Sequence, residues 1–138
     1  MIHIREIDHV VLRVVNLETM LTFYENVLGC NVEKRNDEVG LVQLRAGRSL
    51  IDLVPVSGKL GQAGGGAPGR EGHNVDHICL RVEPFDADAI RGHLLLLGVG
   101  VGDVEQRYGA EGMGPSLYLS DPEGNTIELK GPATSPPV

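Results

Sequence analysis

The sequence is poor in aromatic residues and cysteine, and it carries no excess of basic charge. Aromatic residues make up 4% of the 138 residues, and tryptophan is absent. The two cysteines, Cys30 and Cys79, form neither a CxxC motif nor a disulfide framework, which favours a reducing compartment. The net charge of −7 argues against nucleic acid or an anionic membrane as the main partner, because either would repel the chain.

Long hydrophobic runs are missing as well. The most apolar run, residues 94–101, is far shorter than the roughly 20 residues that a membrane span needs. Charged residues from Arg5 to Asp8 interrupt the apolar residues of the N-terminal stretch, which excludes a signal-peptide core there. With 41% hydrophobic and 22% charged residues, the chain is typical of a soluble globular domain. We therefore expect one domain and a cytoplasmic protein.

What the sequence does contain is a repeat. Residues 7–14 read I-D-H-V-V-L-R-V, and residues 75–82 read V-D-H-I-C-L-R-V. Each copy precedes a stretch with helical periodicity that has a capping residue before it and a glycine after it. The predicted helices cover 16–29, capped by Asn16 and ended by Gly29, and 83–98, capped by Asp86 and ended by Gly98.

Short alternating runs separated by turn residues follow each helix and predict three strands in each half. Each half thus has the order βαβββ, and we predict an α+β fold of two such modules that form curved, mixed-sheet half-barrels around a cleft. The first module covers 4–56, the second covers 74–131, and a Gly-rich linker at 57–73 joins them into a single domain of residues 1–138. The predicted strands after the helices are 31–35, 40–46 and 49–56, and then 99–107, 115–120 and 125–130.

The repeat also places matching polar residues on one face of each module. Because strand residues alternate between faces, His9 and His77 point away from the predicted helices. The last strand of each module contributes a carboxylate to that face, Asp52 in I-D-L and Glu128 in I-E-L. A half-buried histidine or a solvated carboxylate would account for each residue singly, but not for four matched positions.

Two imidazoles with one or two carboxylates are a standard ligand set for a divalent transition metal such as Zn, Ni, Mn, Co or Fe(II). We predict that His9, His77 and Glu128 bind such a metal. Asp52 is a candidate fourth ligand, although its side chain reaches less far than that of Glu.

Other polar residues fall on the same faces. Arg13 and Arg81 either bind an anionic substrate group or are simply solvated. Cys79 is interpreted as small core filler, and the repeated Asp8 and Asp76 have no role that the pattern assigns. Candidates for orienting a substrate, of which Tyr118 is favoured, are Gln43, Arg45, Ser116 and Tyr118.

Over residues 4–131 the chain resembles the vicinal oxygen chelate superfamily. The resemblance lies in I-D-H-V-V-L-R-V, F-Y-E-N-V-L-G, V-D-H-I-C-L-R-V and S-L-Y-L-S-D-P-E-G-N-T-I-E-L-K. The superfamily includes glyoxalase I, extradiol dioxygenases, and fosfomycin and bleomycin resistance proteins, and the segment 109–125 is most similar to its glyoxalase-domain or "virulence protein" branch. The resemblance implies paired modules around a metal, usually in a homodimer. It places His9, His77 and Glu128 at ligand positions, and Asp52 where glyoxalase I has Glu.

These observations give one leading functional hypothesis and two alternatives. The leading one is a metal-dependent lyase or isomerase that acts on a small substrate with two adjacent oxygens, with Glu128, Asp52 and Tyr118 as catalytic candidates. With Fe(II), the same ligands would instead support extradiol-type ring cleavage. The third possibility is a non-catalytic module that binds a small molecule such as an antibiotic.

Overall fold

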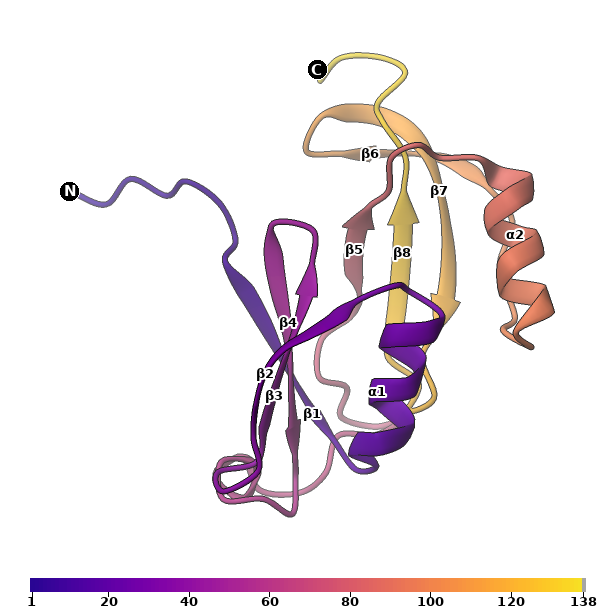
Figure 1. Cartoon of the computed structure of the whole chain (residues 1–138). Coiled ribbons are helices and arrows are strands. Elements are labelled where there is room, and N and C mark those ends of the chain that lie inside the picture. Colours follow the sequence, from indigo (N-terminus) through magenta and orange to yellow (C-terminus); the bar gives the residue numbers. More distant parts are fainter. Residues whose placement is uncertain (138) are drawn as a thin grey trace. The chain divides into compact units, whose positions relative to one another are not determined.

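The computed structural model describes residues 1–137 and divides into two compact units, Met1–Asn74 and Val75–Val138. Each unit contains one four-stranded mixed sheet and one α-helix in the order βαβββ (Figure 1). The predicted α+β fold of two βαβββ modules is therefore confirmed. Within residues 1–137, no helix is long and apolar enough to cross a membrane.

In the first unit the sheet order is β1-β4-β3-β2. Strands β1 and β4, the first and the last of the unit, pair in parallel, and the other neighbours are antiparallel. This pairing sets the strand that begins with His9 directly beside the strand that carries Asp52. The elements are β1 (His9–Val14), α1 (Leu17–Asn26), β2 (Asn31–Asn36), β3 (Leu41–Ala46) and β4 (Ser49–Pro55).

The second unit repeats this topology, with the sheet order β5-β8-β7-β6 and a parallel pair formed by β5 and β8. The strand that follows His77 is thereby set beside the strand that carries Glu128. The elements are β5 (Ile78–Arg81), α2 (Ala87–Leu96), β6 (Glu105–Gly109), β7 (Gly112–Ser120) and β8 (Thr126–Lys130).

Both helices begin at the predicted caps. The side chain of Asn16 accepts a hydrogen bond from the backbone N–H of Thr19 at 3.1 Å, and Asp86 does the same for Ala89 at 3.1 Å. Each helix is followed by a glycine with positive φ, Gly29 at +74° and Gly98 at +75°, a conformation that glycine adopts without strain.

Each unit buries its own apolar residues. In the first unit, α1 buries Met20, Leu21, Phe23 and Tyr24, and Leu12, Leu44 and Leu53 of the sheet are fully buried. In the second unit, pairs in register between β7 and β8 supply the core: Leu117 opposite Leu129, and Leu119 opposite Ile127. Their neighbours along each strand, Tyr118 and Glu128 among them, therefore point to the other face of the sheet.

Two segments differ from the predictions. Strand β6 spans Glu105–Gly109, whereas the predicted strand spans 99–107, because three glycines at 98, 100 and 102 weaken strand pairing before it. The Gly-rich segment after β4 contains a 3-10 helix, η1 (Gly61–Gly64).

The same segment is held by Arg13, whose guanidinium donates hydrogen bonds to the carbonyl oxygens of Gly61, Gly65 and Gly66 at 2.7–2.9 Å. The segment predicted as a Gly-rich linker at 57–73 therefore has a specific anchor that the sequence does not predict.

Candidate functional site

The second unit brings His77 and Glu128 together. Glu128 lies on the central strand β8 and is 6% exposed, and its register partner on β5 is Cys79, two residues after His77. The His77 Nε2 atom lies 3.3 Å from the Glu128 Oε1 atom. A buried carboxylate therefore faces one ring nitrogen of a half-exposed histidine.

The other ring nitrogen of His77 is held by its neighbour in sequence. His77 Nδ1 lies 2.6 Å from the Asp76 carboxylate. In the first unit, His9 Nδ1 lies 2.8 Å from the Asp8 carboxylate. Both aspartates precede the paired part of the strand, which leaves their side chains room to turn back to the ring. The sequence repeats Asp together with His, but the pattern assigns no role to the Asp.

Tyr118 and Arg107 complete the polar face of the second sheet. Tyr118 pairs in register with Glu128, and its ring packs edge-on against the ring of His77 with centroids 5.5 Å apart. Burial and the negative charge of Glu128 raise the pKa of the Tyr118 phenol. The guanidinium of Arg107 lies over the same ring, 4.6 Å from its centroid, and donates to the buried Ser116 hydroxyl at 2.8 Å. Arg107 is a site residue that the sequence reasoning missed.

The first unit contains the matching pair, His9 and Asp52. Asp52 is 3% exposed, and the side-chain amide of Gln43 on the neighbouring strand donates to both of its oxygens at 3.3–3.4 Å. The hydrogen bond that His9 donates to Asp8 and the negative charge of Asp52 raise the pKa of His9. Gln43, a predicted substrate-orienting residue, is thus occupied with positioning the Asp52 carboxylate.

The remaining predictions for polar residues have mixed outcomes. Arg13 anchors the Gly-rich segment, and Arg81 pairs with Glu83 at 2.8 Å and Glu111 at 2.6 Å, so both arginines have structural partners. Cys79 is exposed rather than core filler, because the position lies on the polar face of the sheet. Partial enclosure of its thiol and the charge of Glu128 raise the pKa of Cys79 to about 11.

The structure groups the predicted ligands as one pair in each unit. Across residues 1–137, no three His, Cys, Asp or Glu side chains gather as a preformed metal cluster. The pair in the second unit nonetheless suits a shared cation. Two donor atoms bound to one metal at about 2.0–2.2 Å are about 2.8–3.6 Å apart at common coordination angles. The 3.3 Å between His77 Nε2 and Glu128 Oε1 falls within that range.

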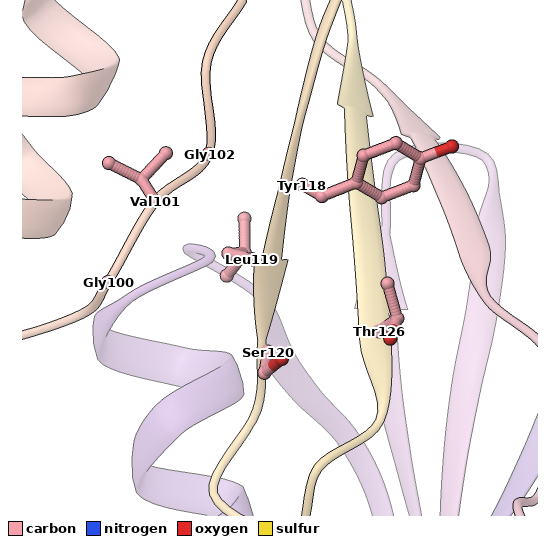
Figure 2. Close-up of a pocket in the computed structure, with 7 residues that line it drawn as sticks. All are labelled: Gly100, Val101, Gly102, Tyr118, Leu119, Ser120 and Thr126. Carbon is pink, nitrogen blue, oxygen red and sulfur yellow. The ribbon is translucent and has the colours of Figure 1, made fainter.

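A shallow pocket of about 350 Å³ lies beside β7 in the second unit, where Val101 and Gly102 pair with Leu119 and Tyr118. Its walls come from the segment 100–102 and from residues of β7 and β8, and Tyr118 is the one titratable residue in its lining. In Figure 2 the Tyr118 ring lies on the β8 side of β7, whereas Val101 lies on the opposite side. The lining includes Tyr118, Ser120 and Thr126, which alternate onto the same strand face as Glu128.

Comparisons with known proteins agree on a family. Over 133 aligned residues the chain is 31% identical to virulence protein STM3117 of Salmonella typhimurium, and the alignment covers 91% of this chain and 83% of that protein. The crystal structure of STM3117 matches with a TM-score of 0.77 at 26% identity, covering 96% of this chain and 100% of that chain. An integron cassette protein from V. cholerae, VCH_CASS1, matches with a TM-score of 0.75 at 27% identity, covering 95% and 98%.

More distant structures share the fold. A lactoylglutathione lyase from Agrobacterium tumefaciens has a TM-score of 0.65 at 20% identity, with 91% of this chain and 92% of that chain covered. The family model of the Glyoxalase/Bleomycin resistance protein/Dioxygenase superfamily matches residues 6–129. This match spans both βαβββ units and confirms the resemblance that the repeated motifs indicated, so the chain belongs to the Glyoxalase/Bleomycin resistance protein/Dioxygenase superfamily.

Proposed function

We propose that the protein is a divalent-metal-dependent enzyme that acts as a lyase or isomerase on a small substrate with two adjacent oxygens. The observation that carries the proposal is the pair formed by His77 Nε2 and the buried carboxylate of Glu128, whose Oε1 atom lies 3.3 Å away. A buried carboxylate that faces an imidazole nitrogen is costly unless a cation lies between them or that nitrogen carries a proton.

The proposed ligands are His77 and Glu128 from the second unit and His9 and Asp52 from the first. Each unit offers the same two donor types, an imidazole nitrogen at or just before one strand of a parallel pair and a carboxylate on the other strand. Nitrogen and oxygen donors in this combination suit Zn, Ni, Mn, Co or Fe(II). We also propose that the active protein is a homodimer, which analytical ultracentrifugation tests directly.

When bound, the metal supplies Lewis-acid stabilisation of negative charge on the substrate oxygens. The chain supplies the proton transfers and the orientation. The Tyr118 phenol, whose ordinary pKa of about 10 is raised further by burial and Glu128, is protonated at neutral pH and donates a hydrogen bond to a substrate oxygen. The carboxylates of Glu128 and Asp52 are the groups that accept and return the substrate proton. Arg107, stacked on the Tyr118 ring, holds the phenol in place.

Metal content tests the proposal. Protein purified without a histidine tag is expected to carry about one metal ion per chain by elemental analysis. His77→Ala and Glu128→Gln are expected to remove it, whereas His73→Ala, in the exposed segment before β5, serves as the matched control and retains it. Metal-free wild-type protein that also fails to take up Zn, Ni, Mn and Fe(II) would contradict the proposal.

A substrate screen then separates the candidate activities. Turnover of adducts between 2-oxoaldehydes and thiols, or opening of epoxides, supports the lyase or isomerase. The two alternatives draw on the family, whose name includes dioxygenases and bleomycin resistance proteins. Oxygen uptake with catechols by the Fe(II)-loaded protein would favour the dioxygenase, and tight ligand binding by a protein that takes up no metal would favour the binding module.

A further inference from the structure

We propose that Asp8 and Asp76 are positioning residues that fix His9 and His77 in the tautomer with the proton on Nδ1, so that Nε2 presents its lone pair. The inference rests on the proposed function, because the purpose of this tautomer is to bind a metal through Nε2. A role is thereby assigned to the repeated aspartate, which neither the strand pattern nor the set of proposed metal ligands explains.

The two hydrogen bonds use the same atoms in both units. Nδ1 of His9 lies 2.8 Å from Oδ2 of Asp8, and Nδ1 of His77 lies 2.6 Å from Oδ2 of Asp76. A carboxylate only accepts hydrogen bonds, so a bond to the aspartate needs the proton on Nδ1. For His77 the contact with Asp76 is also much shorter than the 3.3 Å between Nε2 and Glu128, which favours Nδ1 as the protonated nitrogen. In a neutral imidazole, Nε2 is then the nitrogen with the free lone pair.

The position of Glu128 shows what that lone pair faces. In the neutral Nδ1–H tautomer, Nε2 of His77 directs its lone pair at the Oε1 atom of Glu128, 3.3 Å away. Two electron-rich atoms at this separation repel each other unless a cation lies between them. The Asp76 hydrogen bond therefore prepares His77 to share a metal with Glu128 rather than to donate a hydrogen bond to it.

The side chains of the two aspartates contribute little to the stability of the fold. Their side chains are 88% and 96% exposed, and hydrogen bonds at such positions contribute little to stability. Substitution of either aspartate is therefore expected to leave the protein folded. This separates a positioning role from a structural one.

The first test uses the metal-free protein at mildly alkaline pH and reads the imidazole tautomers from long-range 15N–1H correlation spectra. His9 and His77 are expected to show the Nδ1–H form, whereas His3 and His73, both exposed, show the mixture of free histidine in which Nε2–H dominates. In Asp8→Ala and Asp76→Ala, the neighbouring ring reverts to that mixture. Asp76→Asn keeps a carbonyl acceptor and retains the Nδ1–H form in part.

The second test measures metal affinity by competition with a chromophoric chelator, with Zn as the probe. Asp76→Ala and Asp8→Ala are each expected to weaken binding by about 10- to 100-fold, the usual effect of removing such a partner. Asp76→Asn should recover part of the loss. Asp103→Ala, which removes an exposed aspartate in the loop before β6, is the control and should leave affinity unchanged.

The two tests distinguish failure of the positioning role from failure of the proposed metal enzyme. Rings of His9 and His77 in the Nε2–H form in the wild type, or alanine variants with unchanged tautomers and affinity, would overturn the positioning role. If the rings show Nδ1–H and lose it in the alanine variants while the wild type takes up no metal, the proposed metal enzyme fails and the tautomer control by Asp8 and Asp76 holds.

Discussion

The guanidinium of Arg107 stacks on one side of the Tyr118 ring, with its central carbon 4.6 Å from the ring centroid, while the same ring packs edge-on against His77. Arg107 comes from β6, Tyr118 from β7 and His77 from the residue before β5, so the contacts join three segments of the second unit. Arg107 also supplies the partner of the buried Ser116 hydroxyl. Arg107 thereby contributes both to the packing of this sheet, through Ser116, and to the orientation of the Tyr118 ring on its polar face.

Replacement of Arg107 by leucine is expected to lower the free energy of unfolding by about 1–3 kcal/mol. The substitution removes the cation–π contact and leaves the buried Ser116 hydroxyl without its donor. Arg107→Lys keeps the charge but not the forked hydrogen bonds, so its free energy of unfolding should lie between those of the wild type and Arg107→Leu. Urea denaturation measures the effect, and Arg70→Leu, in an exposed loop, is the control. An unchanged unfolding midpoint in Arg107→Leu would show that the contact is incidental.

Replacement of Arg13 by methionine is expected to expose the segment 57–72 to trypsin. The segment contains two cleavage sites, Lys59 and Arg70, and Arg13 anchors it through three glycine carbonyls. A hydrogen bond from a charged group contributes about 1.5–3 kcal/mol. Loss of even one such bond should raise the rate of cleavage in the native state by about tenfold or more.

Gly64→Ala tests the contact between Arg13 and the Gly-rich segment by a change in the segment instead of in the arginine. A Cβ atom at Gly64 would lie 2.3 Å from Nε of Arg13, so the alanine displaces the guanidinium. Faster cleavage should therefore appear in both variants by mass spectrometry of the fragments. Arg48→Met, at the exposed turn between β3 and β4, serves as the control, and cleavage at the wild-type rate in Arg13→Met would contradict the anchoring role.

Much of the fold follows from local signals in the sequence. The caps Asn16 and Asp86 and the glycines at 29 and 98 mark the helix ends, because each satisfies a backbone requirement within a few residues. Strand alternation likewise predicts that Tyr118 and Glu128 share a face, since facing depends only on position along each strand. The repeat supplies the βαβββ order twice.

The contacts that the sequence does not predict depend on side-chain conformation or on partners far apart in the chain. Asp76 precedes its strand and turns back to His77, a conformation that strand alternation does not describe. Arg107 meets Tyr118 through the pairing of β6 with β7. Strand β6 begins at Glu105, later than the predicted strand, which begins at 99. Arg13 finds carbonyl acceptors about 50 residues away, a distance that no periodicity covers.

The two helix caps offer a matched pair of stability tests, one in each unit. Asn16→Ala and Asp86→Ala each remove a side-chain acceptor from a backbone N–H at the start of a helix. Each substitution is expected to lower the free energy of unfolding by about 1 kcal/mol, measured by urea denaturation. Asn16→Ser and Asp86→Ser retain a capping oxygen and should recover most of the loss. Alanine variants as stable as the wild type would show that the caps contribute nothing in this fold.

Cys30 should make stability depend on alkaline pH. Burial, with a smaller effect of the Glu25 charge, raises the pKa of the Cys30 thiol in the folded protein. As pH rises past the ordinary thiol pKa of about 8.5, the unfolded chain loses this proton first, which favours unfolding. The stability associated with the neutral thiol is therefore present below that pH and is lost as pH rises toward the folded-state pKa.

The measurement uses Cys79→Ser as the background, so that Cys30 is the single thiol that titrates. Urea denaturation of Cys79→Ser should show a larger loss of stability between pH 8 and pH 10 than that of the double variant Cys30→Ala, Cys79→Ser. The double variant is less stable at pH 8, because alanine leaves a small cavity, but its dependence on pH should be flatter. Parallel curves for the two variants would show that Cys30 titrates alike in the folded and unfolded chains.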